Sequence, residues 1–68
     1  MRPGYYRHPK MDSICLEVTK SFYIPEKDAY SLRITWWKWS PKHGVCYCLN
    51  ITERVKWTRP KCREWEEI

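Results

Sequence analysis

The sequence predicts a small all-β, disulfide-rich protein built on a three- to four-stranded antiparallel sheet. The chain has 68 residues, four of them cysteines. A chain this short buries little apolar surface, and disulfides or a bound metal commonly supply the missing stability. Several segments alternate apolar with polar residues, as half-buried strands do, and turn-forming residues separate these segments. No long helical pattern is present.

The first strand is predicted over residues 13–19, in which apolar and polar residues alternate, and residues 22–24 can extend it up to Pro25. Residues 26–28 follow as a polar turn. The strongest strand covers residues 30–39, because β-branched and aromatic residues favour the pleated conformation. Its predicted core face carries Leu32, Ile34 and Trp36, and its other face carries Arg33, Thr35, Trp37 and Trp39.

A hairpin is predicted next, because residues 40–44 have turn chemistry and residues 45–51 alternate again. Its loop would hold four or five residues. A second turn near Thr52 and Glu53 leads to a short strand over residues 54–58, which Pro60 ends. Residues 59–68 are charged and finish in an acidic tip.

Residues 1–11 are predicted to form a flexible basic and aromatic arm, and residues 12–68 a single disulfide-stapled β domain. Pro3, Gly4 and Pro9 interrupt regular structure in the arm, and no apolar period is present. Removal of the arm should therefore leave the fold intact.

The cysteines Cys15, Cys46, Cys48 and Cys62 allow three disulfide pairings. In a strand, Cys46 and Cys48 would project to the same face about 6.6–6.8 Å apart, near the upper limit for a disulfide. Both are therefore expected to pair with Cys15 and Cys62, in either arrangement. Zinc is the alternative, but the spacing does not fit a zinc knuckle and the two histidines are isolated. No metal or other cofactor is predicted.

Asn50, Ile51 and Thr52 form an N-glycosylation sequon. The sequon and the even cysteine count both indicate a secreted glycoprotein, because disulfides persist in the secretory pathway. Met1 is then interpreted as an expression start on a mature sequence. No apolar run approaches the length of a membrane span.

The order Cys15, Trp39, Cys46-x-Cys48, Cys62 resembles the N-terminal half of a von Willebrand factor type C domain. This resemblance implies the pairs Cys15–Cys48 and Cys46–Cys62. The chain has His43 where that family usually has the first cysteine of the cluster, the one that tethers a second subdomain in the family. A half domain of this size also resembles the tick salivary inhibitors of the terminal complement pathway, the CirpT type. That resemblance implies binding of complement component five and blockade of its activation, without catalysis.

No catalytic constellation is present: the carboxylates are scattered, and the disulfides would use every thiol. The protein is therefore not predicted to be an enzyme. Five tryptophans are many for this length, and adjacent Trp36 and Trp37 must point to opposite faces of a regular strand. Exposed aromatics beside arginines are typical of interface hot spots. The predicted partner-binding residues are Arg33, Trp37 and Trp39 first, and Trp57 and Arg59 second.

The formal net charge is +5, and residues 1–63 alone carry +8, because residues 64–68 hold three acids and no base. The leading hypothesis is a secreted protein, monomeric when free, that binds and inhibits a host or extracellular protein target. A small basic nucleic-acid-binding β protein is the alternative, and it predicts neither paired cysteines nor a sequon. An antimicrobial or toxin-like peptide comes third, because eight acidic residues oppose it.

Overall fold

The computed structural model describes residues 1–40 and 45–68, except for the side chains of residues 39, 40, 45–48 and 50. The described chain is all-β apart from one 3-10 turn and one short helix. The elements are β1 (Gly4–His8), β2 (Met11–Ile24), η1 (Pro25–Lys27), β3 (Ala29–Ser40), β4 (Val45–Thr58), α1 (Arg59–Arg63) and β5 (Glu66–Glu67).

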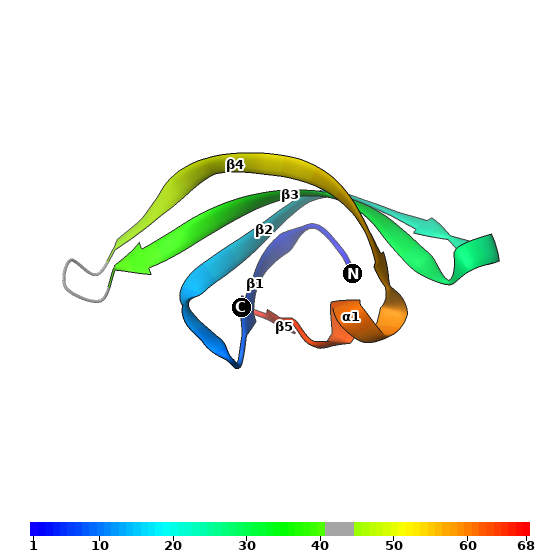
Figure 1. Cartoon of the computed structure of the whole chain (residues 1–68), viewed down its shortest axis with the longest axis horizontal. Helices are drawn as coiled ribbons and strands as arrows, with labels where there is room; N and C mark the ends of the chain where they lie inside the picture. The colour runs from blue at the N-terminus through cyan, green and yellow to red at the C-terminus, as the bar shows by residue number, and fades with distance from the viewer. Residues whose placement is uncertain (41–44) are drawn as a thin grey trace.

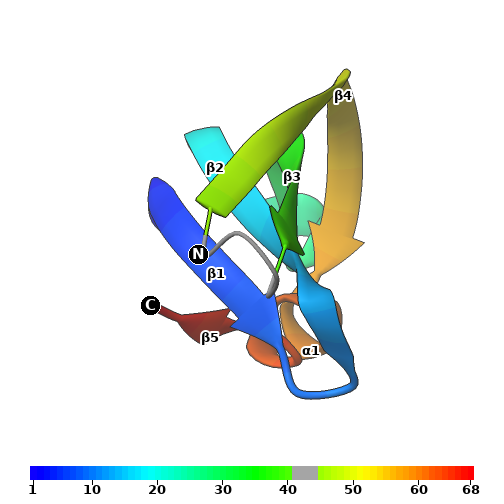
Figure 2. The ribbon, with the colours of Figure 1, turned by 90° about the vertical axis from the view of Figure 1, so that its left-hand side faces the viewer.

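These strands form a single antiparallel sheet of five strands in the order β4-β3-β2-β1-β5. The predicted all-β antiparallel class is confirmed, with more strands than the three or four expected. The long strands arch, and β1, β5 and α1 lie beneath the arch (Figure 1). A view turned by 90° shows the short β5 beside β1, on the side away from β4 (Figure 2).

The core lies under the arch, on the concave face of the sheet. Alternation along β3 directs Leu32 and Ile34 into this core, and Trp36 packs against it. The core face predicted for this strand is therefore confirmed. The buried cluster consists of Tyr6, Leu16, Val18, Leu32, Ile34, Trp57, Cys62 and Trp65.

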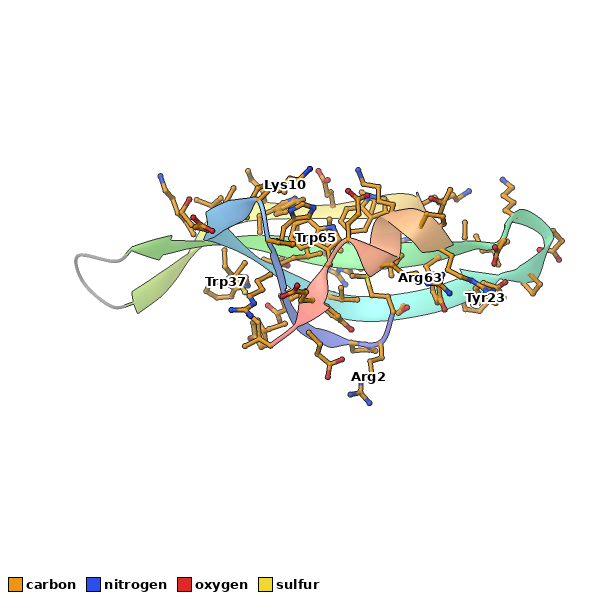
Figure 3. The ribbon with its side chains drawn as sticks, turned by 90° about the horizontal axis from the view of Figure 1, so that it is seen from below. Arg2, Lys10, Tyr23, Trp37, Arg63 and Trp65 are labelled. Carbon is orange, nitrogen blue, oxygen red and sulfur yellow. The ribbon has the colours of Figure 1, made fainter. Side chains whose placement is uncertain are left out.

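The C-terminal segment covers the concave face, where the sequence predicted only a charged tail. Helix α1 has Pro60 in its first turn, a position at which the missing amide hydrogen is harmless. The turn after the helix brings Trp65 back under the sheet, where its ring lies against the rings of His8, Trp36 and Trp57. In Figure 3, which views the sheet from below, Trp65 lies between β1 and α1.

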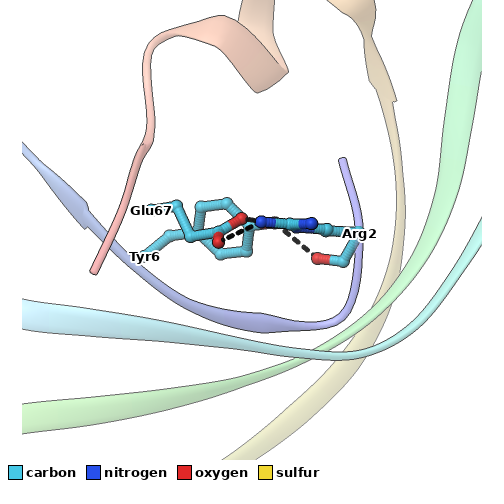
Figure 4. A network of polar contacts seen from close by, with 3 residues as sticks. All are labelled: Arg2, Tyr6 and Glu67. Carbon is cyan, nitrogen blue, oxygen red and sulfur yellow. Dashed lines mark hydrogen bonds and ion pairs between the residues drawn. The ribbon is translucent and has the colours of Figure 1, made fainter.

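Residues 4–8 form strand β1, where the sequence predicted a flexible arm. β1 pairs with both β2 and β5, and Tyr6 is only 5% exposed. The Arg2 guanidinium donates to both carboxylate oxygens of Glu67, at 2.9 and 2.7 Å, and the Tyr6 hydroxyl donates to the Arg2 carbonyl (Figure 4). The sequence did not predict this strand because Tyr6 is its one large core-facing side chain, and a single such residue produces no apolar period.

Strand β4 is continuous from residue 45 to 58, so the turn predicted near Thr52 and Glu53 is wrong. The register shifts there instead: Thr35 lies opposite Thr52, but Trp37 lies opposite Cys48. β4 therefore contains extra residues between these two pairs, in the manner of a β-bulge. Pairing of β3 with β2 stays regular at this point, so Trp36 and Trp37 keep opposite faces.

The predicted disulfides receive no support from this structure. Cys62 is buried and carries a free thiol, whose pKa is raised by burial. Its sulfur lies 4.0 Å from the carbonyl oxygen of Trp57, and Cys46 lies eleven residues before Trp57 on β4, roughly 30 Å or more away along an extended strand. A Cys46–Cys62 bridge therefore requires a different placement of α1.

Candidate binding surface

The convex side of the sheet, which we call the open face, is not covered by α1 or β5, because both lie on the concave side (Figures 1 and 2). Alternation and register assign side chains to this face strand by strand. It carries Tyr5, Arg7, Cys15, Glu17, Lys20, Phe22, Ser31, Arg33, Thr35, Trp37, Thr52, Arg54 and Lys56.

Trp37 lies on the open face, as predicted, but it is half-buried rather than fully exposed. Its indole nitrogen donates a hydrogen bond to Glu17 Oε1 at 2.9 Å. Cys15 on β2 and Cys48 on β4 occupy the positions on either side of it. Those two backbones are therefore two strand spacings apart, about 9.4–9.8 Å, so a Cys15–Cys48 bridge requires backbone movement.

Arg33 is also on the open face, as predicted, and its side chain is exposed. It lies directly opposite Lys20 on β2 and Arg54 on β4. Between Arg33 and Trp37, the residue of β3 on this face is Thr35, whose hydroxyl lies 3.1 Å from that of Thr52. The open face is therefore cationic around Arg33 and neutral at the two threonines.

The second predicted binding group, Trp57 with Arg59, is not supported. Trp57 is a core residue with 9% exposure, because its position opposite Tyr30 turns it to the concave side. Arg59 is partly exposed, but its guanidinium lies 2.8 Å from Asp28 Oδ1 and donates to the Tyr23 hydroxyl at 3.1 Å. That guanidinium already has partners within the chain.

The same contacts explain the ionisation of Asp28. The Tyr23 hydroxyl donates to Asp28 at 2.6 Å, and this bond, followed by the charge of Arg59, holds the pKa of the carboxyl below its usual range. Asp28 adopts a left-handed backbone conformation with φ of 48°, which ends η1. The predicted polar turn over residues 26–28 is thus confirmed, and Arg59 at the start of α1 holds it through the ion pair with Asp28.

The side chains of Trp39, Cys46, Cys48 and Asn50 lie outside the described residues. The backbone places Trp39 opposite Cys46 near the β3–β4 hairpin. Asn50, the predicted glycosylation site, is on β4 at the edge of the sheet. Their predicted roles in binding, disulfide formation and glycosylation remain predictions.

Sequence reasoning missed Lys20, Phe22 and Arg54 as surface residues of the same face as Arg33. The alternation of Leu16 and Val18 would place Lys20 in the core, but the pairing of β2 with β3 shifts between Val18 and Lys20. Residue 19 is the extra residue of this bulge, so the faces exchange after it. No feature of the sequence marks a bulge at this position.

An open cleft of about 610 Å³ lies under the arch, on the concave side of the sheet. Two of the arginines that line it, Arg2 and Arg59, are already paired with Glu67 and Asp28. It is therefore a weaker candidate for a ligand site than the open face. The cleft is lined by Met1, Arg2, Tyr6, Tyr30, Arg59, Cys62, Arg63, Trp65 and Glu67.

Within the described part of the chain, no three metal-ligating side chains cluster together. No helix there is both long and apolar enough to cross a bilayer. No protein-family model, curated protein or solved structure matches the chain.

Proposed function

We propose that the chain is a secreted, non-catalytic protein that binds an extracellular protein and inhibits it by steric blockade. The open face is the observation that carries this proposal. It is a broad surface on a continuous five-stranded sheet, and it combines the tryptophan Trp37 with the exposed Arg33. Aromatic and arginine side chains on a rigid surface are the usual anchors of a protein interface.

Two further features belong to the proposal. The proposal includes two disulfides in the secreted protein, for which the backbone around Cys15 and Cys48 and the position of α1 must differ from this structure, and a glycan on Asn50. Monomeric protein is expected in the absence of a target, because the chain carries a formal net charge of +5 and like-charged copies repel.

Complement component five is the first target to test, because the sequence resembles the tick inhibitors of terminal complement activation. The purified component would be passed over the immobilised, full-length chain, and binding would be compared with Trp37→Ala. Saturable binding that this variant weakens, together with inhibition of complement-dependent lysis, supports the proposal. If component five does not bind, proteins that the chain captures from plasma are identified, and the activity of each is measured with and without the chain. The proposal is contradicted if the chain inhibits none of them.

A further inference from the structure

Three cations form a row across three neighbouring strands of the open face. Lys20 on β2 lies directly opposite Arg33 on β3, which lies directly opposite Arg54 on β4. Adjacent strands are about 4.8 Å apart, so the backbone positions of the three cations span roughly 10 Å. Like charges at directly opposite positions destabilise a sheet. Repulsion within this row therefore destabilises the folded state.

No carboxylate forms an ion pair with this row in the described part of the chain. Three of the four ion pairs, Arg2–Glu67, Arg7–Glu66 and His8–Glu64, join the two ends of the chain, and Arg59–Asp28 joins α1 to η1.

Two acids remain close to the row. Glu17 accepts the hydrogen bond of Trp37. Glu53 lies opposite Ile34 in the strand register, but it is exposed and borders a depression together with Arg33 and Arg54. Neither acid forms an ion pair with Lys20, Arg33 or Arg54.

The next row along the same face adds an exposed ring and a fourth cation. Phe22 and Lys56 both lie opposite Ser31, and Phe22 is 71% exposed. Because Ser31 is small, a shallow depression of about 190 Å³ remains beside it. Its lining consists of Lys20, Phe22, Ser31, Arg33 and Arg54.

We propose that Lys20, Arg33, Arg54 and Lys56, together with Phe22, form the docking site for an acidic segment of the protein target. Guanidinium groups bind carboxylates with two parallel hydrogen bonds, and the ring of Phe22 offers an apolar contact beside them. The proposal rests on the function proposed above and names the chemistry of the target: clustered Asp or Glu residues next to an apolar side chain.

The observations favour a protein partner over a nucleic acid. Single-stranded nucleic acids bind along platforms of several aromatic side chains that stack successive bases. Phe22 is the one ring that lines the depression with Lys20, Arg33 and Arg54. The excess positive charge would also accelerate the approach of an acidic protein.

The first experiment tests whether the row opposes folding. Arg33→Glu places a carboxylate between Lys20 and Arg54 and should raise the melting temperature at low salt, with the gain shrinking as salt increases. Lys10→Glu, in the turn between β1 and β2, makes the same change of charge away from the row at a residue that forms no ion pair in the described structure, so it is the matched control. An Arg33→Glu protein that melts no higher than this control would overturn the charge argument.

The second experiment tests the ligand chemistry on the full, isotope-labelled chain by NMR titration. Four probes are compared: a Glu-rich peptide with one leucine, the same peptide with Gln for Glu, heparin, and single-stranded oligothymidylate. We expect the Glu-rich peptide to shift the amides of residues 20, 22, 33, 54 and 56 in a salt-sensitive manner. The Arg33→Glu/Arg54→Glu double variant should bind it at least about tenfold more weakly, and Lys10→Glu should bind it as the unmodified chain does.

The proposal is overturned if the Glu-rich peptide leaves these amides unchanged, if the double variant binds it equally well, or if heparin or the oligonucleotide binds the same residues more tightly. If a protein target binds the unmodified chain and the double variant equally well, the proposed docking site is wrong, and the proposed function is not affected. Binding of the acidic peptide without inhibition of any extracellular protein would remove the proposed function and leave the site.

Discussion

The indole rings of Trp57 and Trp65 stack with their centroids 5.8 Å apart and their planes inclined by 12°. Trp57 ends strand β4, and Trp65 returns under the sheet after α1, so this contact fixes the C-terminal segment onto the concave face. Both rings are almost fully buried. The small core therefore depends on a residue that lies within a charged segment of the sequence.

Replacement of Trp65 by alanine should reduce the free energy of unfolding by about 3–5 kcal/mol, because it removes a large buried ring and leaves a cavity. Denaturation by urea, followed by circular dichroism, measures this loss. Ile68→Ala is the control, because Ile68 is 72% exposed and its backbone amide keeps its bond to Tyr5. An equal effect of the two variants would contradict the observed packing.

Tyr6→Ala should reduce the free energy of unfolding by roughly 3 kcal/mol, because this ring fills the core between β1 and β5. Tyr6→Phe should lose only about 1 kcal/mol, the value of the hydroxyl hydrogen bond to Arg2. Tyr5→Ala, on the open face, is the control and should change little. Thermal melting compares the three. A stable Tyr6→Ala protein would restore the interpretation of residues 1–11 as a dispensable arm.

Trp36 and Trp37 should respond in opposite ways to truncation. Trp36→Ala should destabilise the fold by roughly 3 kcal/mol, because Trp36 packs against Trp65 with the ring centroids 5.7 Å apart. Trp37→Ala should weaken target binding by about 2 kcal/mol or more and affect folding less. Melting and affinity are measured on both variants. The faces would be wrongly assigned if Trp37→Ala unfolded the protein while Trp36→Ala remained folded without binding.

Stability should decline in acid because of two carboxyls whose pKa values are lowered in the folded state. The pKa of Glu67 is lowered from 4.5, mainly by the hydrogen bond from Arg2, and that of Asp28 from 3.8, mainly by the hydrogen bond from Tyr23. Each contributes stability above its unfolded pKa and loses it as the pH falls through the lower folded value.

The melting temperature should therefore fall as the pH drops below about 4.5. Glu67→Gln should make this decline shallower, because glutamine does not titrate. Glu26→Gln removes an acid that forms no ion pair in the described structure, and it is the control. The same slope in all three proteins would show that the pair of Arg2 and Glu67 does not contribute.

Reduction of the protein purified from a secreting cell should increase its intact mass by about four hydrogens, the signature of two disulfides. Peptide mapping of the unreduced protein would then identify the pairs. A Cys46–Cys62 link would place α1 at the other end of β4 from its position in this structure. Four free thiols would contradict the secreted assignment.

The face assignment of β3 could be predicted from the sequence because a strand has a period of two. Alternation over residues 30–37 placed Leu32 and Ile34 in the core and Arg33 and Trp37 on the opposite face, as the structure has them. Alternation is a local property of a strand and does not depend on the neighbouring strands.

The sequence by itself determined the antiparallel all-β class, the two faces of β3 and the excess of positive charge, since each follows from composition or from neighbours along the chain. Only the tertiary structure decided that β1 joins the sheet, that Trp65 closes the core and that Lys20, Arg33 and Arg54 share one row. Those features depend on bulges and on pairing between distant segments. A bulge of one residue exchanges the faces of a strand and leaves no mark in the pattern of residues.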